Sequence, residues 1–157
     1  MDNYVNKYPL LWITMFIGEY SYIIDHKKRL AIPSKFRKTL GKRAIVTKGI
    51  DICLTVYPIA EWEKLAKKLG SLPSSKMDAR GFIRIMLAGA VDVGLDKLGR
   101  ILIPDYLKKY AGLKKEVIIL GLSNRIEVWD EKTWKTYKQK TEKEIGDMAS
   151  RLEELGV

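Results

Sequence analysis

Two short stretches of this chain place an acid and a base four residues apart in the same context. Asp25 and Arg29 stand in IDHKKRLAIP, and Asp96 and Arg100 stand in LDKLGRILIP; three apolar residues and a proline follow each arginine. A carboxylate at the start of a tight turn accepts hydrogen bonds from backbone N–H groups. The arginine then leaves at the start of the next strand, with its guanidinium free or paired with the aspartate.

The doubled DxxxR pattern has a structural interpretation and a functional one. A single copy is short and common, and a hairpin turn stapled by a local salt bridge accounts for it. Two copies in the same context favour a shared role. Gly99 gives the second turn the freedom to adopt a positive φ. The first turn has Lys28 at that place, which predicts mild backbone strain or a slightly different turn.

Basic side chains crowd around the first of these turns. Residues 27–48 contain nine lysines and arginines and no aspartate or glutamate. A run of like charge without an internal partner needs an external anion or open water. The second turn is basic to a smaller degree, with Lys97 and Arg100 followed by four lysines and two acids between positions 105 and 116.

The whole chain is basic as well, with 29 Lys and Arg against 19 Asp and Glu and a formal net charge of +10. Such a surplus favours a polyanionic partner, meaning nucleic acid or an anionic membrane surface. The plainer alternative is a soluble basic protein. The apolar run at 10–17 is too short to span a membrane, which takes about 20 residues. We expect residues 1–14 to be a leader read from an upstream start codon, with Met15 as the simpler start.

Histidine and cysteine are too scarce for most catalytic or metal chemistry. His26 and Cys53 are the only residues of their types, which excludes Cys-type and His-rich metal sites and makes nucleophilic triads a poor interpretation. GLDKLGR lacks the glycines and spacing of a phosphate-binding loop. Paired carboxylates stay possible if Asp25 and Asp96 approach each other. We expect no enzyme, metal, cofactor or small-molecule substrate, and a reducing cytoplasmic setting.

The similarity between the two halves extends well beyond the turns. Each half reads as strand, DxxxR turn, strand, short helix, two strands and a longer helix. Neither half has enough strand to bury its own apolar face, so we expect one shared core with pseudo-two-fold symmetry. The tail offers either a packing stripe or a frayed surface helix. The expected divisions are a first repeat at 15–72, a helical connector at 73–88, a second repeat at 89–140 and a charged helical tail at 141–157.

In order and spacing, these segments resemble the MraZ family of bacterial transcription regulators, within the AbrB-like swapped-hairpin superfamily. The resemblance covers nearly the whole chain from Met15 to about Lys140. Two features depart from the family pattern, namely the leader and Lys28 in place of the usual glycine. The segments that carry the resemblance are MFIGEY, both DxxxR motifs, VYPIAEWEKL, LAGAVDVGLDKLGRILIP, YAGLKKEVIILG and IEVWDEKTW.

The resemblance implies a fold, an assembly and a function. The fold would be α+β, with two tandem half-repeats forming one pseudo-two-fold swapped-hairpin β-barrel core and short flanking helices. The chain would form a ring-type homo-oligomer and regulate transcription from direct repeats in double-stranded DNA, upstream of its own division and cell-wall gene cluster. It would be cytoplasmic and nucleoid-associated. The DNA-facing residues would be Asp25, Lys27, Lys28, Arg29, Asp96, Lys97 and Arg100.

The chemistry of these side chains suggests how such a contact works. Lysines position a protein on phosphates, and arginine reads a guanine edge through two hydrogen bonds. Which arginine reads a base and which holds a phosphate stays open at this point. The alternative to a sequence-specific regulator is a non-enzymatic ring-forming scaffold or a general nucleic-acid-binding protein.

Overall fold

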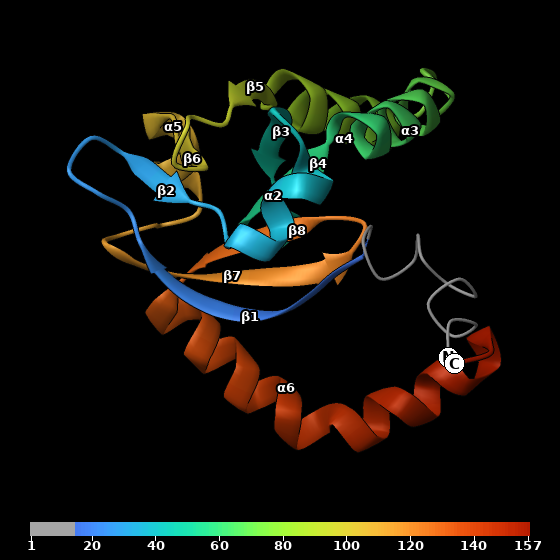
Figure 1. The fold of residues 1–157 in the computed structure, drawn as a ribbon. Helices are drawn as coiled ribbons and strands as arrows, with labels where there is room; N and C mark the ends of the chain where they lie inside the picture. The colour runs from blue at the N-terminus through green and yellow to red at the C-terminus, as the bar shows by residue number, and fades with distance from the viewer. Residues whose placement is uncertain (1–14) are drawn as a thin grey trace, which may run out of the picture.

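The computed structural model describes residues 15–157 and has the predicted α+β fold (Figure 1). The leader predicted at 1–14 lies outside the described residues. The first half contributes β1 (Phe16–Ile23), β2 (Arg29–Ala31), α2 (Ser34–Leu40), β3 (Arg43–Lys48), β4 (Leu54–Pro58), α3 (Ile59–Gly70) and α4 (Met77–Ala88). The second half contributes β5 (Val91–Gly94), β6 (Arg100–Leu102), α5 (Asp105–Tyr110), β7 (Glu116–Ser123), β8 (Ile126–Asp130), α6 (Glu131–Leu152) and a 3-10 turn (Glu153–Leu155).

The main sheet is built by exchange of strands between the two halves. Its order is β1-β7-β8-β4-β3-β5, and every pairing is antiparallel. The first strand of each half therefore pairs with a strand of the other half, β1 with β7 and β5 with β3. The order reads the same from either edge when the two halves are interchanged, so the sheet itself has the pseudo-two-fold symmetry that the repeat predicts.

A pseudo-two-fold axis can be placed through two pairs of equivalent residues. In the β2–β6 ribbon Leu30 lies opposite Ile101, and in the β4–β8 pair Thr55 lies opposite Glu127. Each pair matches one residue with its own counterpart in the other repeat. Outside the ribbon, the N–H of Ile32 donates to the carbonyl of Gly99 and the N–H of Ile103 donates to that of Lys28, both at 2.9 Å.

The expected closure into a barrel is not confirmed, because the six-stranded sheet is open. Strands β1 and β5 stand at its two edges, and β2 and β6 form a separate two-stranded sheet. These two strands are only three residues long and pair with each other. The tight turn before each of them redirects the chain away from the large sheet, leaving one isolated bridge between Ile24 and Leu30.

The core draws equally on both halves and explains the apolar residues that follow each arginine. Leu30 and Ile32 are buried together with their counterparts Ile101 and Ile103. Phe36 of α2 joins the same core. Burying each large apolar side chain contributes about 1.5–3 kcal/mol, and the two halves share this gain because their side chains interdigitate.

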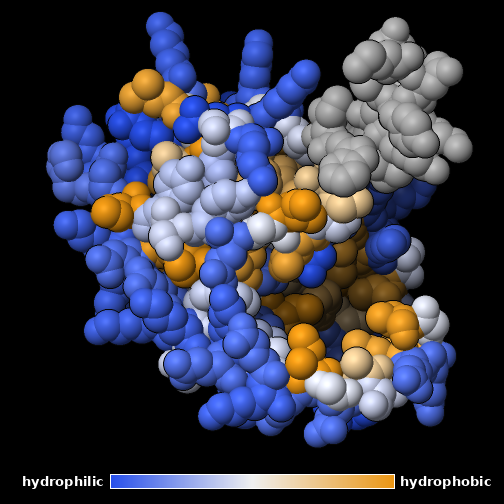
Figure 2. All heavy atoms as spheres, turned by 60° about the horizontal axis from the view of Figure 1, so that its bottom comes forward, coloured by the Kyte–Doolittle hydropathy of each residue, from blue (hydrophilic) through white to orange (hydrophobic). Residues whose placement is uncertain are grey.

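The helices break the symmetry of the sheet. In the first half α3 is followed by α4, which packs against it, whereas the equivalent helix α6 is 22 residues long and reaches away from the sheet as an arm (Figure 1). The tail predicted at 141–157 is therefore largely a continuation of α6. Figure 2 shows apolar surface gathered in the recess between the sheet and the far end of this arm. Among the described residues, no helix is long and apolar enough to cross a membrane.

Candidate nucleic-acid interface

The first DxxxR turn is held by the aspartate at its start. Asp25 Oδ1 accepts hydrogen bonds from the backbone N–H groups of Lys27 at 2.8 Å and Arg29 at 3.0 Å. The backbone N–H of Lys28 donates to the carbonyl of Asp25 at 3.0 Å. The carboxylate is thus a fixed part of the turn, as the Asx-type interpretation predicts.

The second turn repeats this geometry. Asp96 Oδ1 accepts from the backbone N–H groups of Leu98 and Arg100, both at 2.9 Å. The N–H of Gly99 donates to the carbonyl of Asp96 at 2.9 Å. Backbone N–H bonds from residues 29 and 100 are the largest cause of the lowered pKa of Asp25 and Asp96, so both carboxylates are charged at neutral pH.

Residues 28 and 99 confirm that both turns need a positive φ at the same place. Lys28 has a φ of 64° and Gly99 a φ of 72°. A side chain in this region costs about 1–2 kcal/mol, which the first turn tolerates. At Gly99 a Cβ atom would also lie 2.2 Å from Nε of Arg37, so a side chain there would force Arg37 to move in addition to adopting the positive φ.

The arginines of the two turns differ, because only Arg100 has an ion-pair partner within residues 15–157. Nε of Arg100 lies 2.8 Å from Oδ2 of Asp96, and its Nη1 lies 3.9 Å from Oδ2 of Asp25. Arg100 thus links the two turns and brings both carboxylates together across the pseudo-two-fold axis. The side chain of Arg29 makes no hydrogen bond or ion pair within residues 15–157.

The lysines of the turns differ in the same way. Nζ of Lys28 lies 2.8 Å from Oδ2 of Asp105, so this lysine is held by the other half of the chain. Lys27 and Lys97 are exposed and form no ion pair in the described part of the chain. The counterpart of Lys27 in the second turn is Leu98, which is also exposed. The site residues predicted from the sequence therefore lie near one another, but Lys28 and Arg100 are held in ion pairs within the chain.

Two basic hollows lie at α2 and α5, the equivalent short helices of the two repeats, and only the first is also lined by residues of a DxxxR turn. One, of about 410 Å³, lies between α2 and the second turn, and the other, of about 380 Å³, lies at the end of α5. The first is lined by Arg37, Lys38, Gly41, Lys42, Leu95, Asp96, Lys97 and Gly99. The second is lined by Asp105, Lys108, Lys109, Gly112, Leu113 and Lys114. The helix cations were not predicted as site residues, although the acid-free run at 27–48 was the signal for the first set.

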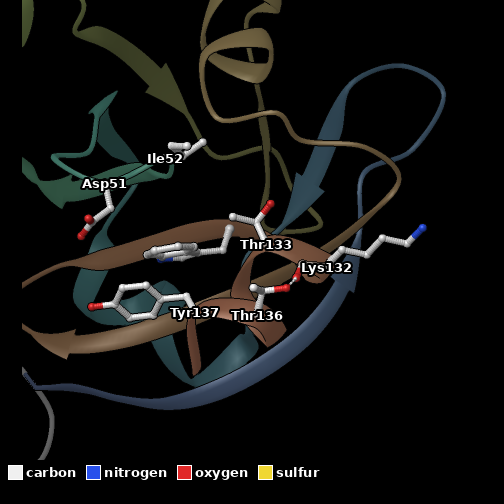
Figure 3. Close-up of a pocket in the computed structure, with 7 residues that line it drawn as sticks. Asp51, Ile52, Lys132, Thr133, Thr136 and Tyr137 are labelled. Atoms are coloured by element: carbon white, nitrogen blue, oxygen red, sulfur yellow. Dashed lines mark hydrogen bonds between the residues drawn. The ribbon is translucent and has the colours of Figure 1, made fainter. Parts of the chain in front are cut away.

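A third hollow is of a different kind and lies on the α6 side of the sheet. It measures about 510 Å³ and is lined by Trp129 and Tyr137, whose rings lie 5.0 Å apart, with Asp51 and Ile52 on the opposite wall (Figure 3). Nearby, burial raises the pKa of the Cys53 thiol to about 12, so this cysteine is an inert core residue. Within residues 15–157 there is no cluster of three or more His, Cys, Asp or Glu side chains placed to hold a metal.

Fold and site together define a class, namely a chain of two fused half-repeats that exchange strands and present paired DxxxR turns. Comparison with known proteins gives the family. The family model for "MraZ protein", described as antitoxin-like, matches residues 15–85 and again residues 86–154. A protein named transcriptional regulator MraZ, from Halothermothrix orenii, is 48% identical over 143 residues, which cover 91% of this chain and all of the relative. This chain belongs to the MraZ family, which confirms the resemblance.

Proposed function

We propose that this protein is a sequence-specific DNA-binding regulator of transcription that contacts double-stranded DNA with its two DxxxR turns. One observation carries the proposal: the guanidinium of Arg29 is unpaired within residues 15–157, on a turn that Asp25 holds in place, in a basic stretch that has no acid between residues 27 and 48. The name of the relative from Halothermothrix orenii, a transcriptional regulator, supports the same function. Rigid turns suit this role because they fix the register of side chains on the duplex.

The two arginines divide the work in this proposal. Arg29 reads a guanine edge in the major groove, since it is free to offer two parallel N–H donors. Arg100 is a positioning residue, because its ion pairs with Asp96 and Asp25 tie the two turns together. Lys27 and Lys97 contact phosphates on either side. Lys28 supports the first turn through Asp105 and adds charge to the same surface.

The basic hollows extend the contact along the DNA backbone. Each lies at the short helix of one repeat and is lined by more lysine and arginine side chains than acidic ones. We expect phosphates of the two strands to sit in them. Such contacts supply affinity without sequence information, so the hollows set the strength of binding and the turns set its specificity.

The target and assembly follow from the family resemblance. The operator would be a set of short direct repeats upstream of the chain's own gene, in the division and cell-wall cluster. A ring-type homo-oligomer would present one pair of turns per subunit, so neighbouring subunits could engage successive repeats. Joining weak contacts in this way raises the overall affinity through effective concentration.

Footprinting on the DNA upstream of the gene tests the proposal directly. We expect protection of short, regularly spaced segments, and loss of that protection with Arg29→Ala. Lys143→Ala, which removes an exposed charge far along α6, is the matched control and should protect the same segments. Uniform protection of any duplex by the wild-type protein would favour the second candidate, a general nucleic-acid-binding protein or scaffold. The net charge of +10 is the observation behind that candidate.

A further inference from the structure

The tips of the two DxxxR turns have equivalent backbones and opposite chemistry. In each turn the residue two positions after the aspartate donates its backbone N–H to Oδ1 of that aspartate, Lys27 at 2.8 Å and Leu98 at 2.9 Å. The two side chains therefore start from equivalent points of the repeat, and the same kind of hydrogen bond fixes both points. One side chain is a cation, and the other is a leucine that is 62% exposed.

Packing within the chain does not account for the leucine at this tip. In the part of the chain that the structure describes, Leu98 belongs to neither cluster of packed apolar side chains, whereas Leu95, just before the same turn, packs against the larger one. The hydrogen bond that Leu98 contributes to the turn comes from its backbone and not from its side chain. Single exposed leucines are ordinary on protein surfaces, so the exposure of Leu98 acquires a meaning only from the side chains around it.

The other residues of the second turn are poorly placed to read a base. Asp96 accepts the backbone N–H bonds of the turn, and Gly99 has no side chain. Arg100 is held in ion pairs by the carboxylates of both turns, so offering two N–H donors to a base would break these pairs. Lys97 lines the first basic hollow, among cations that suit a phosphate. Leu98 is thus the side chain that this turn has left to meet a base.

We propose that Leu98 reads a thymine in the major groove, by packing its methyl groups against the C5-methyl group of the base. Thymine is the base that presents an apolar group in the major groove, and leucine has no donor or acceptor with which to read the polar edges of the others. The inference rests on the proposed function and deepens it. Arg29 selects a guanine and Leu98 selects a thymine, so the two turns of one subunit select different bases.

Removal of the thymine methyl group tests this contact from the DNA side. The probe is a duplex of the segment protected in footprinting, in which each thymine of one repeat is replaced in turn by deoxyuridine, which lacks only the C5-methyl group. We expect one position at which this replacement weakens binding of the wild type about fourfold in fluorescence anisotropy. That factor corresponds to about 0.8 kcal/mol, the value of one buried apolar carbon group.

Two changes at Leu98 test the contact from the protein side. Leu98→Ala should bind the thymine and deoxyuridine duplexes with equal affinity, and its melting temperature should stay near that of the wild type, because the turn is closed by the backbone of this residue. Leu98→Lys gives the second turn the tip of the first, so it should bind all duplexes more tightly and be equally insensitive to deoxyuridine. The matched control is Leu155→Ala, which changes a leucine that is 76% exposed near the end of the chain and should keep the fourfold sensitivity.

The other outcomes overturn the proposal in distinguishable ways. If no single deoxyuridine weakens binding of the wild type, or if Leu98→Ala stays as sensitive as the wild type at the same position, Leu98 does not contact a thymine methyl group. Either result leaves the proposed function standing as long as the wild type protects its operator and Arg29→Ala does not. A wild type that protects no segment in preference to others would instead overturn the proposed function, and this contact with it.

Discussion

At the scale of single residues, the unequal partners of Arg29 and Arg100 give the sharpest prediction. Arg29→Ala should weaken binding to the operator by about 1–3 kcal/mol relative to random DNA, the value of one bidentate base contact. Its melting temperature should stay near that of the wild type, because the side chain holds no partner in the described structure. Fluorescence anisotropy with operator and scrambled duplexes measures the first quantity, and circular dichroism measures the second.

The matched change Arg100→Ala should behave differently. It removes the ion pairs to Asp96 and Asp25, so the turns loosen and binding to every duplex falls together with the melting temperature. The stability loss is small, since pairs at the surface are worth about 0–1 kcal/mol. If Arg100→Ala abolished only operator discrimination while Arg29→Ala left it intact, the assigned roles would be reversed.

The turn carboxylates also predict how stability depends on pH. The folded-state pKa of Asp25 and of Asp96 is lowered, first by backbone N–H bonds, so the unfolded chain binds protons more readily than the folded chain. Their stabilising contribution is complete above the unfolded pKa of about 4 and is lost as the pH falls through the lower folded value. Between about pH 6 and pH 3, the free energy of unfolding measured with urea should therefore fall less steeply in the double variant Asp25→Asn, Asp96→Asn than in the wild type. If the free energy of unfolding depended on pH equally in the variant and the wild type, the pKa of these two carboxylates would not change on folding.

At the scale of elements, the local pattern predicted the strands, the turns and the short helices well. Asp25 and Asp96 mark turns because their side chains bond to nearby backbone, and Pro33 and Pro104 directly precede the short helices α2 and α5. These signals act within a few residues and are readable in sequence. The pairing of Arg100 with Asp96 was one of the two predicted options, whereas the pairs Lys28–Asp105 and Arg100–Asp25 were not predictable, because only the fold brings those distant residues near each other. The open sheet and the length of α6 were missed for the same reason.

The exchange of strands predicts that neither half folds alone as a monomer. A chain of residues 15–85 lacks β7, the partner of β1, and one of residues 86–154 lacks β3, the partner of β5. We expect each half to show little protection of backbone amides from hydrogen exchange, and the equimolar mixture to regain the protection of the full chain. A single half that protects its own β3–β4 or β7–β8 hairpin as a monomer would refute the shared-core interpretation.

At the scale of the whole molecule, electrostatics predicts how affinity responds to salt. Under the proposed function, the net charge of +10 and the two basic hollows would provide phosphate contacts that release counterions on binding. Lys27→Ala and Lys97→Ala should each lower the slope of log K against log salt by about 0.9 and weaken operator and random DNA equally. Lys132→Ala, on the α6 side of the sheet, is the control and should leave the slope unchanged. A change in sequence preference with either turn lysine would mean that it reads a base.

The fusion of two half-repeats into one chain has a consequence for the symmetry of the DNA site that the proposed function implies. A true dimer of identical halves must present two identical turns, and its best target is a palindrome. Here one turn reads DHKKR and the other DKLGR, with a free arginine in the first, as far as residues 15–157 show, and a bridging arginine in the second. Under the proposed function, the two ends of each subunit would differ along the duplex, and the site that it recognises would have a direction.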